Sequence, residues 1–285
     1  MAIVPRGAFR PALVGASLVA VVAAATSASA QGRLDARFVV TLAGLPIGKG
    51  AWVIDISDNQ YTAAASGATS GLLQVLASGT GSGASRGAII GGRPSPTTFA
   101  SNVTTDRKTE EIRMTIAGGN VKDYAITPPL QTSPERVPVT EAHRVSVTDP
   151  MTASLIRVPG NGDPMRPEAC QKVISIFDGR MRFDLKLAYK RMERVKAERG
   201  YDGPVVVCGV QFTPISGHVP SRPAIKYLIE RRDMEVWLAP IASTRVVVPF
   251  RVVIPTPLGL GVMQATQFVT ASQKPRPTPV GNRTQ

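Results

Sequence analysis

The chain has 285 residues, of which 33 are Lys or Arg and 20 are Asp or Glu, which gives a formal net charge of +13. This length suits one large all-β domain or two small ones, and it is sufficient to bury a real hydrophobic core. The positive excess favours polyanionic partners, although it is also consistent with a charge that only keeps the protein in solution.

Residues 1–30 have the pattern of a secretory signal peptide. Arg6 and Arg10 supply a positive start, an apolar run covers 12–25, and small residues end at Ala30. The apolar run is about 14 residues long, shorter than the roughly 20 that a membrane-spanning helix needs. We therefore expect cleavage after Ala30 rather than a membrane anchor, and a periplasmic protein of net charge +11 with no transmembrane segment.

Export narrows the choice of polyanion. We expect no nucleic-acid partner, because nucleic acid is not the usual polyanion outside the cytoplasm. The expected partners are a lipid, a glycolipid or another anionic polymer of the cell envelope, with an envelope protein as the alternative.

The first half of the chain alternates apolar and polar residues with a period of two, which is typical of antiparallel strands. Gly118-Gly119 predicts a hairpin turn. The Gly- and Ser-rich residues 67–92 leave two alternatives open, strongly bent strands or flexible loops. The clearest alternating stretches are residues 37–42, 52–56, 97–104, 111–116 and 121–126.

A Pro-rich connection over 127–147 interrupts this pattern. Asp149 then predicts the N-cap of a short helix with Pro150 at its first position. Met151 and Leu155 would share the inner face of that helix.

The stretch after the Asp178-Gly179 turn is the most regular of the sequence. Large apolar residues at every second position predict a strand whose apolar side chains face inward and whose basic side chains face outward. The parity slips near Lys190-Arg191, which a β-bulge would explain. A helix over Leu187–Arg199 is the rival interpretation. The inward residues would be Met181, Phe183, Leu185, Leu187 and Tyr189.

The last third contains further alternating strands and one more short helix, over residues 222–233, with Ile225, Leu228 and Ile229 facing inward. The polar, Pro-rich tail 272–285 is expected to be disordered. In total the sequence predicts about eleven antiparallel strands, each with one buried and one solvated face.

We expect one all-β domain over 31–271, in which a large curved sheet forms a barrel-like or spiral fold. A sheet of this size must curl or close, and a short helix would plug an open end. The alternative fold is a β-sandwich.

Cys170 and Cys208 predict a disulfide, because the chain is expected to be exported and its cysteine count is even. A simple meander would place the two on opposite sides of a middle strand, roughly 10 Å apart. A disulfide requires Cα atoms about 5.5 Å apart. Either the segment before Lys172 arches over the sheet, or the strand order is not sequential.

The sequence offers no case for catalysis. The two histidines, His143 and His218, lack a nucleophile-elbow context, and no metal-ligand cluster or dinucleotide motif is present. We therefore predict no catalytic residues, no metal ligands and no cofactor. A hydrolase that uses His143 with Asp149 and Ser154 is the remote alternative.

The order of several segments resembles the secreted proteobacterial domain-of-unknown-function family three-one-zero-eight. They are FVVTLAGLPIGKGAWVI, SRGAIIGGRPSPTTF, TDPMTASL, CQKVISIFDGRMRFDLKL and VWLAP…VPFRVVIPTPLGLGVMQA. The resemblance implies a periplasmic β-rich protein and carries no established activity, so it assigns no catalytic residues.

The leading hypothesis is a non-enzymatic periplasmic envelope protein that binds an amphipathic or anionic ligand. A protein-binding scaffold that uses edge strands or the 127–140 segment is the alternative. Each residue chosen for the ligand site has a plainer interpretation as core or solvated surface. Apolar contacts are assigned to Trp52, Phe183, Tyr189 and Trp237, and head-group contacts to Arg180, Arg182, Lys186 and Lys190.

Overall fold

A computed structural model describes residues 31–71 and 78–272, together with Met1. The predicted signal peptide, residues 72–77 of the Gly-rich region and the tail from residue 273 lie outside the described residues. Ser272, which the sequence placed in the tail, is the last residue of a strand.

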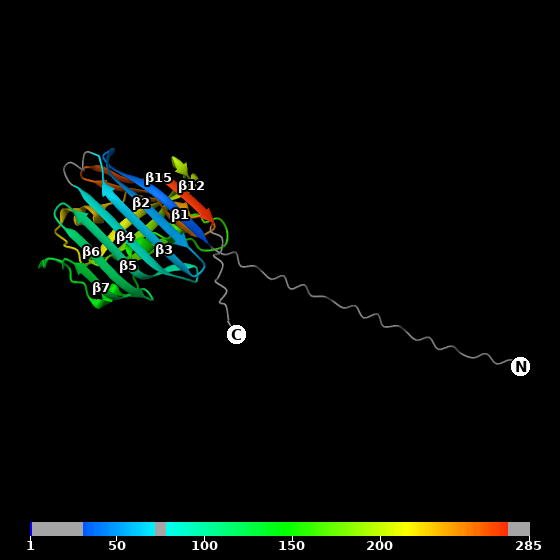
Figure 1. The fold of residues 1–285 in the computed structure, drawn as a ribbon, viewed down its shortest axis with the longest axis horizontal. Helices are drawn as coiled ribbons and strands as arrows, with labels where there is room; N and C mark the ends of the chain where they lie inside the picture. The colour runs from blue at the N-terminus through cyan, green and yellow to red at the C-terminus, as the bar shows by residue number, and fades with distance from the viewer. Residues whose placement is uncertain (2–30, 72–77, 273–285) are drawn as a thin grey trace, which may run out of the picture.

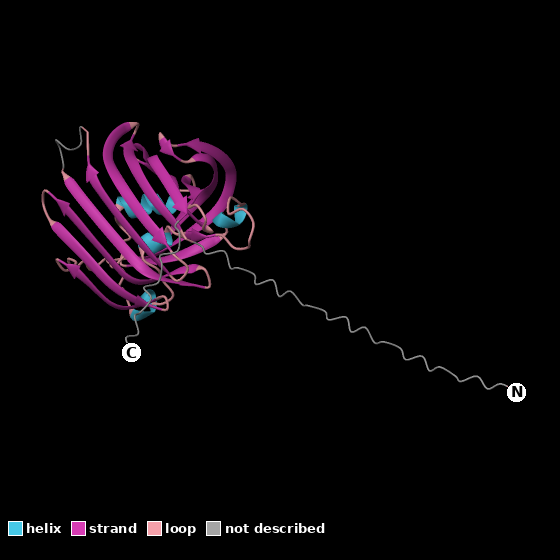
Figure 2. Cartoon of the chain, turned by 45° about the vertical axis from the view of Figure 1, so that its right-hand side comes forward, coloured by secondary structure: helices cyan, strands magenta, loops and turns pink. Residues whose placement is uncertain are grey.

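The described chain forms a single sheet of fifteen strands, antiparallel except for one short pair (Figure 1). The sheet rolls up rather than stacking as two layers (Figure 2), so the β-sandwich alternative is wrong and the curved, barrel-like fold is confirmed. The strands are β1 Gly32–Leu42, β2 Leu45–Ile56, β3 Gln60–Thr69, β4 Gly79–Ile90, β5 Arg93–Thr105, β6 Thr109–Ala117, β7 Asn120–Thr127, β8 Ile156–Arg157, β9 Lys172–Phe177, β10 Arg182–Lys196, β11 Arg199–Gly200, β12 Asp202–Ser216, β13 Met234–Pro240, β14 Val246–Thr256 and β15 Gly259–Ser272.

The strand order is β7-β6-β5-β4-β3-β2-β1-β15-β14-β13-β12-β10-β9, with β8 paired to β14 and β11 to β15. Four more strands are present than the eleven expected. Part of the excess is β4, in the Gly-rich region that was left open, and part is the two-residue strands β8 and β11. Four short helical segments complete the fold: η1 Glu141–Arg144, α2 Pro150–Ala153, η2 Pro167–Cys170 and α3 Pro223–Glu230.

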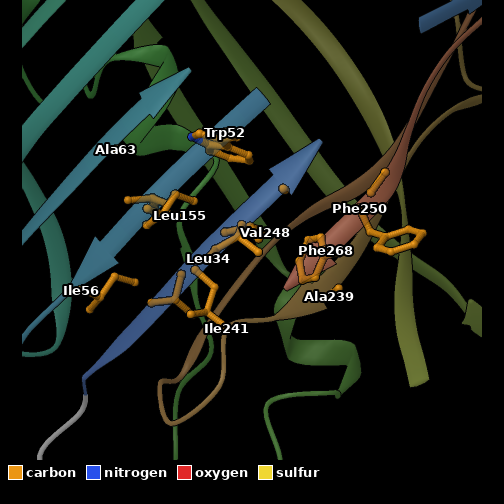
Figure 3. Close-up of a cluster of buried hydrophobic side chains, with 14 of the residues drawn as sticks. Leu34, Trp52, Ile56, Ala63, Leu155, Ala239, Ile241, Val248, Phe250 and Phe268 are labelled. Atoms are coloured by element: carbon orange, nitrogen blue, oxygen red, sulfur yellow. The ribbon is translucent and has the colours of Figure 1, made fainter. Parts of the chain in front are cut away.

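The apolar residues that alternate with polar ones along β1–β3 belong to the first core cluster. Leu34, Trp52 and Tyr61 are buried, and they pack with Val248, Phe268 and their neighbours from the C-terminal strands (Figure 3). Apolar burial of this kind contributes about 25 cal/mol per Å². These strands therefore behave as the period-two pattern predicted.

Strand β12 departs from that pattern. Val205 to Cys208 are four consecutive residues with 0% exposure. Val205 belongs to the first core cluster, whereas Val206 and Cys208 belong to a second cluster that also contains Leu187 and Val247. The prediction of one solvated face is wrong for this part of β12, because successive side chains point to opposite faces and both faces are covered.

Strand β10 confirms the strand interpretation of residues 182–196 and excludes the rival helix. Its register against β12 shifts between Tyr189, which pairs with Cys208, and Arg191, which pairs with Val207. Lys190 is therefore the extra residue of the predicted bulge.

The predicted disulfide joins Cys170 and Cys208, whose Cα atoms are 5.4 Å apart. Strands β9, β10 and β12 are sequential neighbours, as in a simple meander. The 3-10 helix η2, which ends at Cys170, contacts both β10 and β12. The chain before Lys172 thus arches across β10, the first of the two alternatives.

A crossing segment, residues 147–157, connects the two ends of the strand order. Val147 N–H donates to the carbonyl of Gly119 in the β6–β7 turn, at 2.8 Å. Thr148 N–H donates to Ser175 O of β9, and Phe177 N–H donates back to Thr148 O, both at 2.9 Å. Because β7 and β9 are the first and last strands of the order, this segment bridges the opening that the sheet leaves.

Asp149, in the same segment, is fully buried. As predicted, it caps α2: its Oδ1 accepts from the backbone N–H of Met151 and Thr152, at 2.9 and 3.0 Å. Its Oδ2 accepts from Ser85 Oγ of β4 and from Thr152 Oγ1, at 3.1 and 2.5 Å. The Tyr61 hydroxyl lies 2.5 Å from Thr152 Oγ1, so the cluster ties α2 to β3 and β4.

Helix α3 is shorter than predicted, over Pro223–Glu230. Ile225 and Leu228 are half-buried, as expected, but Ile229 is 39% exposed. The inward prediction for Ile229 is wrong, because a helix of eight residues on the surface buries only one narrow stripe.

Removing the disulfide tests whether it stabilises the segment before Lys172 that crosses β10. We expect the double substitution Cys170→Ala/Cys208→Ala to lower the free energy of unfolding by about 4 kcal/mol, because the bond closes a loop of 38 residues in the unfolded chain. Urea unfolding of oxidised protein, reduced protein and the double variant measures this change. A loss below about 1 kcal/mol would contradict the structural role.

Asp149 predicts a pH dependence of stability. Burial raises the pKa of Asp149 above its ordinary value, despite the hydrogen bonds that favour the carboxylate. Between the unfolded value of about 3.9 and the raised folded pKa, the folded protein binds more protons, so stability falls as the pH rises through this window and is constant above it.

Asp149→Asn should abolish that dependence while keeping the cap, because the amide oxygen still accepts from the α2 backbone. Urea unfolding between pH 3 and pH 8 measures it, with the exposed Asp123→Asn as control. Equal pH profiles for wild type and Asp149→Asn would refute the assignment.

Candidate functional site

An apolar cavity of about 340 Å³ lies among β9, β10, β12, β13 and β14, with contributions from α2 and α3. Its walls are almost entirely aliphatic and aromatic. The volume falls at the lower end of the range for small-molecule sites, and such sites are typically concave and apolar. Characteristic wall residues are Ile174, Phe183, Leu185, Val210, Phe212 and Leu228.

The strand register explains how these side chains gather. Leu185 of β10 pairs with Ile174 of β9 on one side and with Phe212 of β12 on the other. Cross-strand partners project to the same face of a sheet. The rings of Phe183 and Phe212 are 5.5 Å apart. The two-residue repeat that made β10 stand out in the sequence therefore builds one wall of the cavity.

The four aromatic residues predicted for ligand contact do not come together. Phe183 lines the cavity. Tyr189 is 41% exposed, so its predicted inward position is wrong; it lies at the bulge. Trp52 is buried in the first core cluster, against Phe38. Trp237 lies on β13 between two guanidinium groups.

The four predicted basic residues are not one unpaired strip. Arg180 forms an ion pair with Glu110 of β6. Arg182 Nη1 lies 2.6 Å from Asp184 Oδ1, and Lys190 Nζ lies 2.7 Å from Glu235 Oε1. Lys186 is exposed. Three of the four charges are thus compensated within the fold.

Glu235 is the centre of the polar network beside the cavity, which it also lines. It accepts hydrogen bonds from Arg191, Lys190 and the Trp237 indole N–H, at 2.9, 2.7 and 2.9 Å. The bond from Arg191, followed by those from Lys190 and Trp237, lowers the pKa of Glu235 to about 2. Arg191 and Arg251 lie 5.4 and 5.1 Å from the Trp237 ring centroid, within cation–π range.

A second cavity, of about 580 Å³, adjoins the first. It shares Ala153, Ile156 and Ile174 with the apolar cavity. Its distinctive residues are the cations Arg93, Arg157 and Lys172. Sequence reasoning missed these three, because they come from β5, β8 and β9 and have no shared spacing or motif.

The residues proposed for hydrolysis are engaged elsewhere. His143 Nδ1 accepts from the backbone N–H of Thr140 at 3.1 Å. Ser154 Oγ donates to the carbonyl of Met151 at 2.5 Å. The Asp149 carboxylate accepts four hydrogen bonds, one each from Ser85 and Met151 and two from Thr152.

Among residues 31–71 and 78–272, no group of three or more His, Cys, Asp or Glu is placed to hold a metal ion. Over the same residues, no helix combines the length and the apolar character needed to cross a bilayer.

Comparison with known proteins identifies the family. The protein-family model described as "Protein of unknown function (DUF3108)" matches residues 37–266. The chain therefore belongs to this family, which confirms the resemblance seen in the sequence. No curated protein matches the chain. A solved structure described as a β-barrel-like protein of domain of unknown function DUF1849 from Brucella abortus is similar, with a TM-score of 0.45 and 10% identity, over 86% of this chain and 99% of that chain.

Glu235→Gln should destabilise the protein by about 1–3 kcal/mol at neutral pH, because two cations lose their carboxylate partner. The lowered pKa means that this stabilisation is present above the unfolded value of about 4.3 and is lost as the pH falls towards about 2. Urea unfolding at pH 7 and at pH 2 checks the difference. Glu193→Gln, which removes only one bond to Arg191, is the control. A larger loss in the control than in Glu235→Gln would count against the network.

Proposed function

We propose that this protein is a non-enzymatic binding protein of the periplasm, which holds the acyl chain of an envelope amphiphile in the apolar cavity. The observation that carries the proposal is the cavity itself: about 340 Å³ of space lined by side chains such as Phe183, Leu185 and Val210. A folded protein normally fills such space with its own side chains, because interiors are close-packed.

The chemistry of the walls favours a hydrocarbon guest. Each methylene group transferred from water to such surroundings contributes about 0.8 kcal/mol. Polar groups at the cavity are few, and the principal one, Glu235, already has its donors in Arg191, Lys190 and Trp237. A ligand that needs many hydrogen bonds would find no free partners there.

The sequence supports the compartment. The expected signal peptide and the disulfide both fit an oxidising location outside the cytoplasm. In the periplasm, acyl chains are available from the membranes on either side. Exposure of a free acyl chain to water is unfavourable, so a protein cavity that covers the chain would stabilise it.

The test is a titration of the protein, purified in native form after expression of the full chain, with the fluorescent fatty acid cis-parinaric acid. Val210→Phe adds a ring to a half-buried wall residue of β12 and should weaken binding at least about tenfold, because the cavity is filled. Val103→Phe makes the same change at a position on β5 that is 45% exposed, and it should bind like wild type.

Thermal unfolding of both variants confirms that they remain folded. Absence of binding by wild type, or equal binding by wild type and Val210→Phe, would overturn the proposed function.

A further inference from the structure

Three cationic side chains meet in the second cavity. Arg93 begins β5, Arg157 ends β8 and Lys172 begins β9, and all three line the same space of about 580 Å³. The sheet path does not bring these strands together. They meet because the crossing segment carries β8 to β14 and joins β9 to the rest of the fold.

In the described part of the chain, Arg93, Arg157 and Lys172 form no ion pair. They differ in this from Arg180, Arg182 and Lys190, each of which has a carboxylate partner. Lys172 is half-buried, and its Nζ donates to the backbone carbonyl of Arg157. Burial, and then the charges of Arg93 and Arg157, lower the pKa of Lys172. Like charges held close together are unfavourable unless an anion joins them.

One acidic residue, Glu168 of η2, also lines this cavity. Its Oε2 is buried and has no hydrogen-bond partner. The wall therefore offers three cations and one unpaired acceptor. Arg157, Arg166 and Asp163 lie near Arg245, and Arg245 donates to the carbonyls of Val158, Pro159 and Gly162.

The β4–β5 turn leaves room for the side chain of Arg157. Gly92 has a φ of +74°, and a Cβ built on it would lie 2.5 Å from Arg157 Nε and 2.7 Å from Nη2. Any other residue at this position would displace the guanidinium. The glycine therefore lets the guanidinium of Arg157 lie against the turn that precedes Arg93.

The cavity that holds the cation cluster and the apolar cavity lie next to each other and share three lining residues. Ala153, Ile156 and Ile174 line both spaces, and Ile156 is the chain neighbour of Arg157. A binding site for an amphiphile needs an apolar space for the acyl chain and charged groups for the head group. Here the two lie side by side.

We propose that Arg93, Arg157 and Lys172 bind the phosphate or carboxylate head group of the ligand whose acyl chain occupies the apolar cavity. Guanidinium and ammonium groups form charge-assisted hydrogen bonds with such anions. Glu168 Oε2 accepts from a hydroxyl or amino group on the same head group. This inference rests on the proposed function, and it narrows the ligand to an anionic amphiphile.

The experiment uses isothermal titration of natively purified protein with dodecyl phosphate, dodecanol and inorganic phosphate. Dodecyl phosphate is kept below its micellar concentration and dodecanol below its solubility limit. Wild type should bind dodecyl phosphate at least about tenfold more tightly than dodecanol, and inorganic phosphate more weakly than either. Arg157→Met/Lys172→Met keeps the aliphatic stems and should lose the preference for dodecyl phosphate while retaining dodecanol.

Arg37→Met/Lys122→Met is the matched control, because it also removes one arginine and one lysine, here from exposed positions on β1 and β7. It should bind all three ligands like wild type. If the cluster variant fails to fold, the exposed Arg93→Met tests the same site with a smaller expected loss, of about threefold or more.

The outcomes separate the two proposals. If the cluster variants bind dodecyl phosphate as tightly as wild type while dodecanol also binds, the head-group site is wrong and the apolar function stands. If neither amphiphile binds but inorganic phosphate binds through the cluster, the site serves a free anion and both the apolar function and the head-group assignment are overturned. Equal loss in the Arg37→Met/Lys122→Met control would show a general charge effect and would also overturn the site.

Discussion

The buried carboxylate of Asp149 holds the crossing segment, on which the other features of this fold depend. Ser85 on β4 and the α2 backbone both donate to it, and the adjacent Thr148 joins β9 by two backbone hydrogen bonds. A carboxylate taken out of water is tolerated only when its oxygens find donors. Here the donors come from parts of the chain that are far apart, so satisfying Asp149 also fixes α2 and β8, which line both cavities.

Local patterns in the sequence were sufficient to predict the local structure. The two-residue repeat around Phe183 and Leu185 predicted β10 and the face that lines the apolar cavity, and the break in that repeat predicted the bulge at Lys190. The Asp149 cap was equally readable, because capping involves only residues three or fewer apart. In each case the determining interaction lies within one strand or one turn.

Interactions between segments that are distant in the chain could not be predicted from the sequence. Arg180 meets its partner Glu110 across the seam between β6 and the β9–β10 turn, so the charge of a residue that looked free in the sequence is compensated. Arg93, Arg157 and Lys172, which form no ion pair in the described ranges, are brought together only by the tertiary fold. Alternation also could not show that Val205–Cys208 is covered on both faces, because coverage depends on how far the sheet rolls.

The proposed ligand is an amphipathic anion, because the apolar cavity lies beside three cations that form no ion pair. The most direct test of this proposal is to identify what the protein carries. Natively purified protein, expressed as the full chain, would be extracted and analysed by lipid mass spectrometry beside Val210→Phe, whose cavity is filled. The account predicts a near-stoichiometric acyl amphiphile with a phosphate or carboxylate head group in wild type, much reduced in the variant. Equal, trace amounts of lipid in both preparations would contradict it.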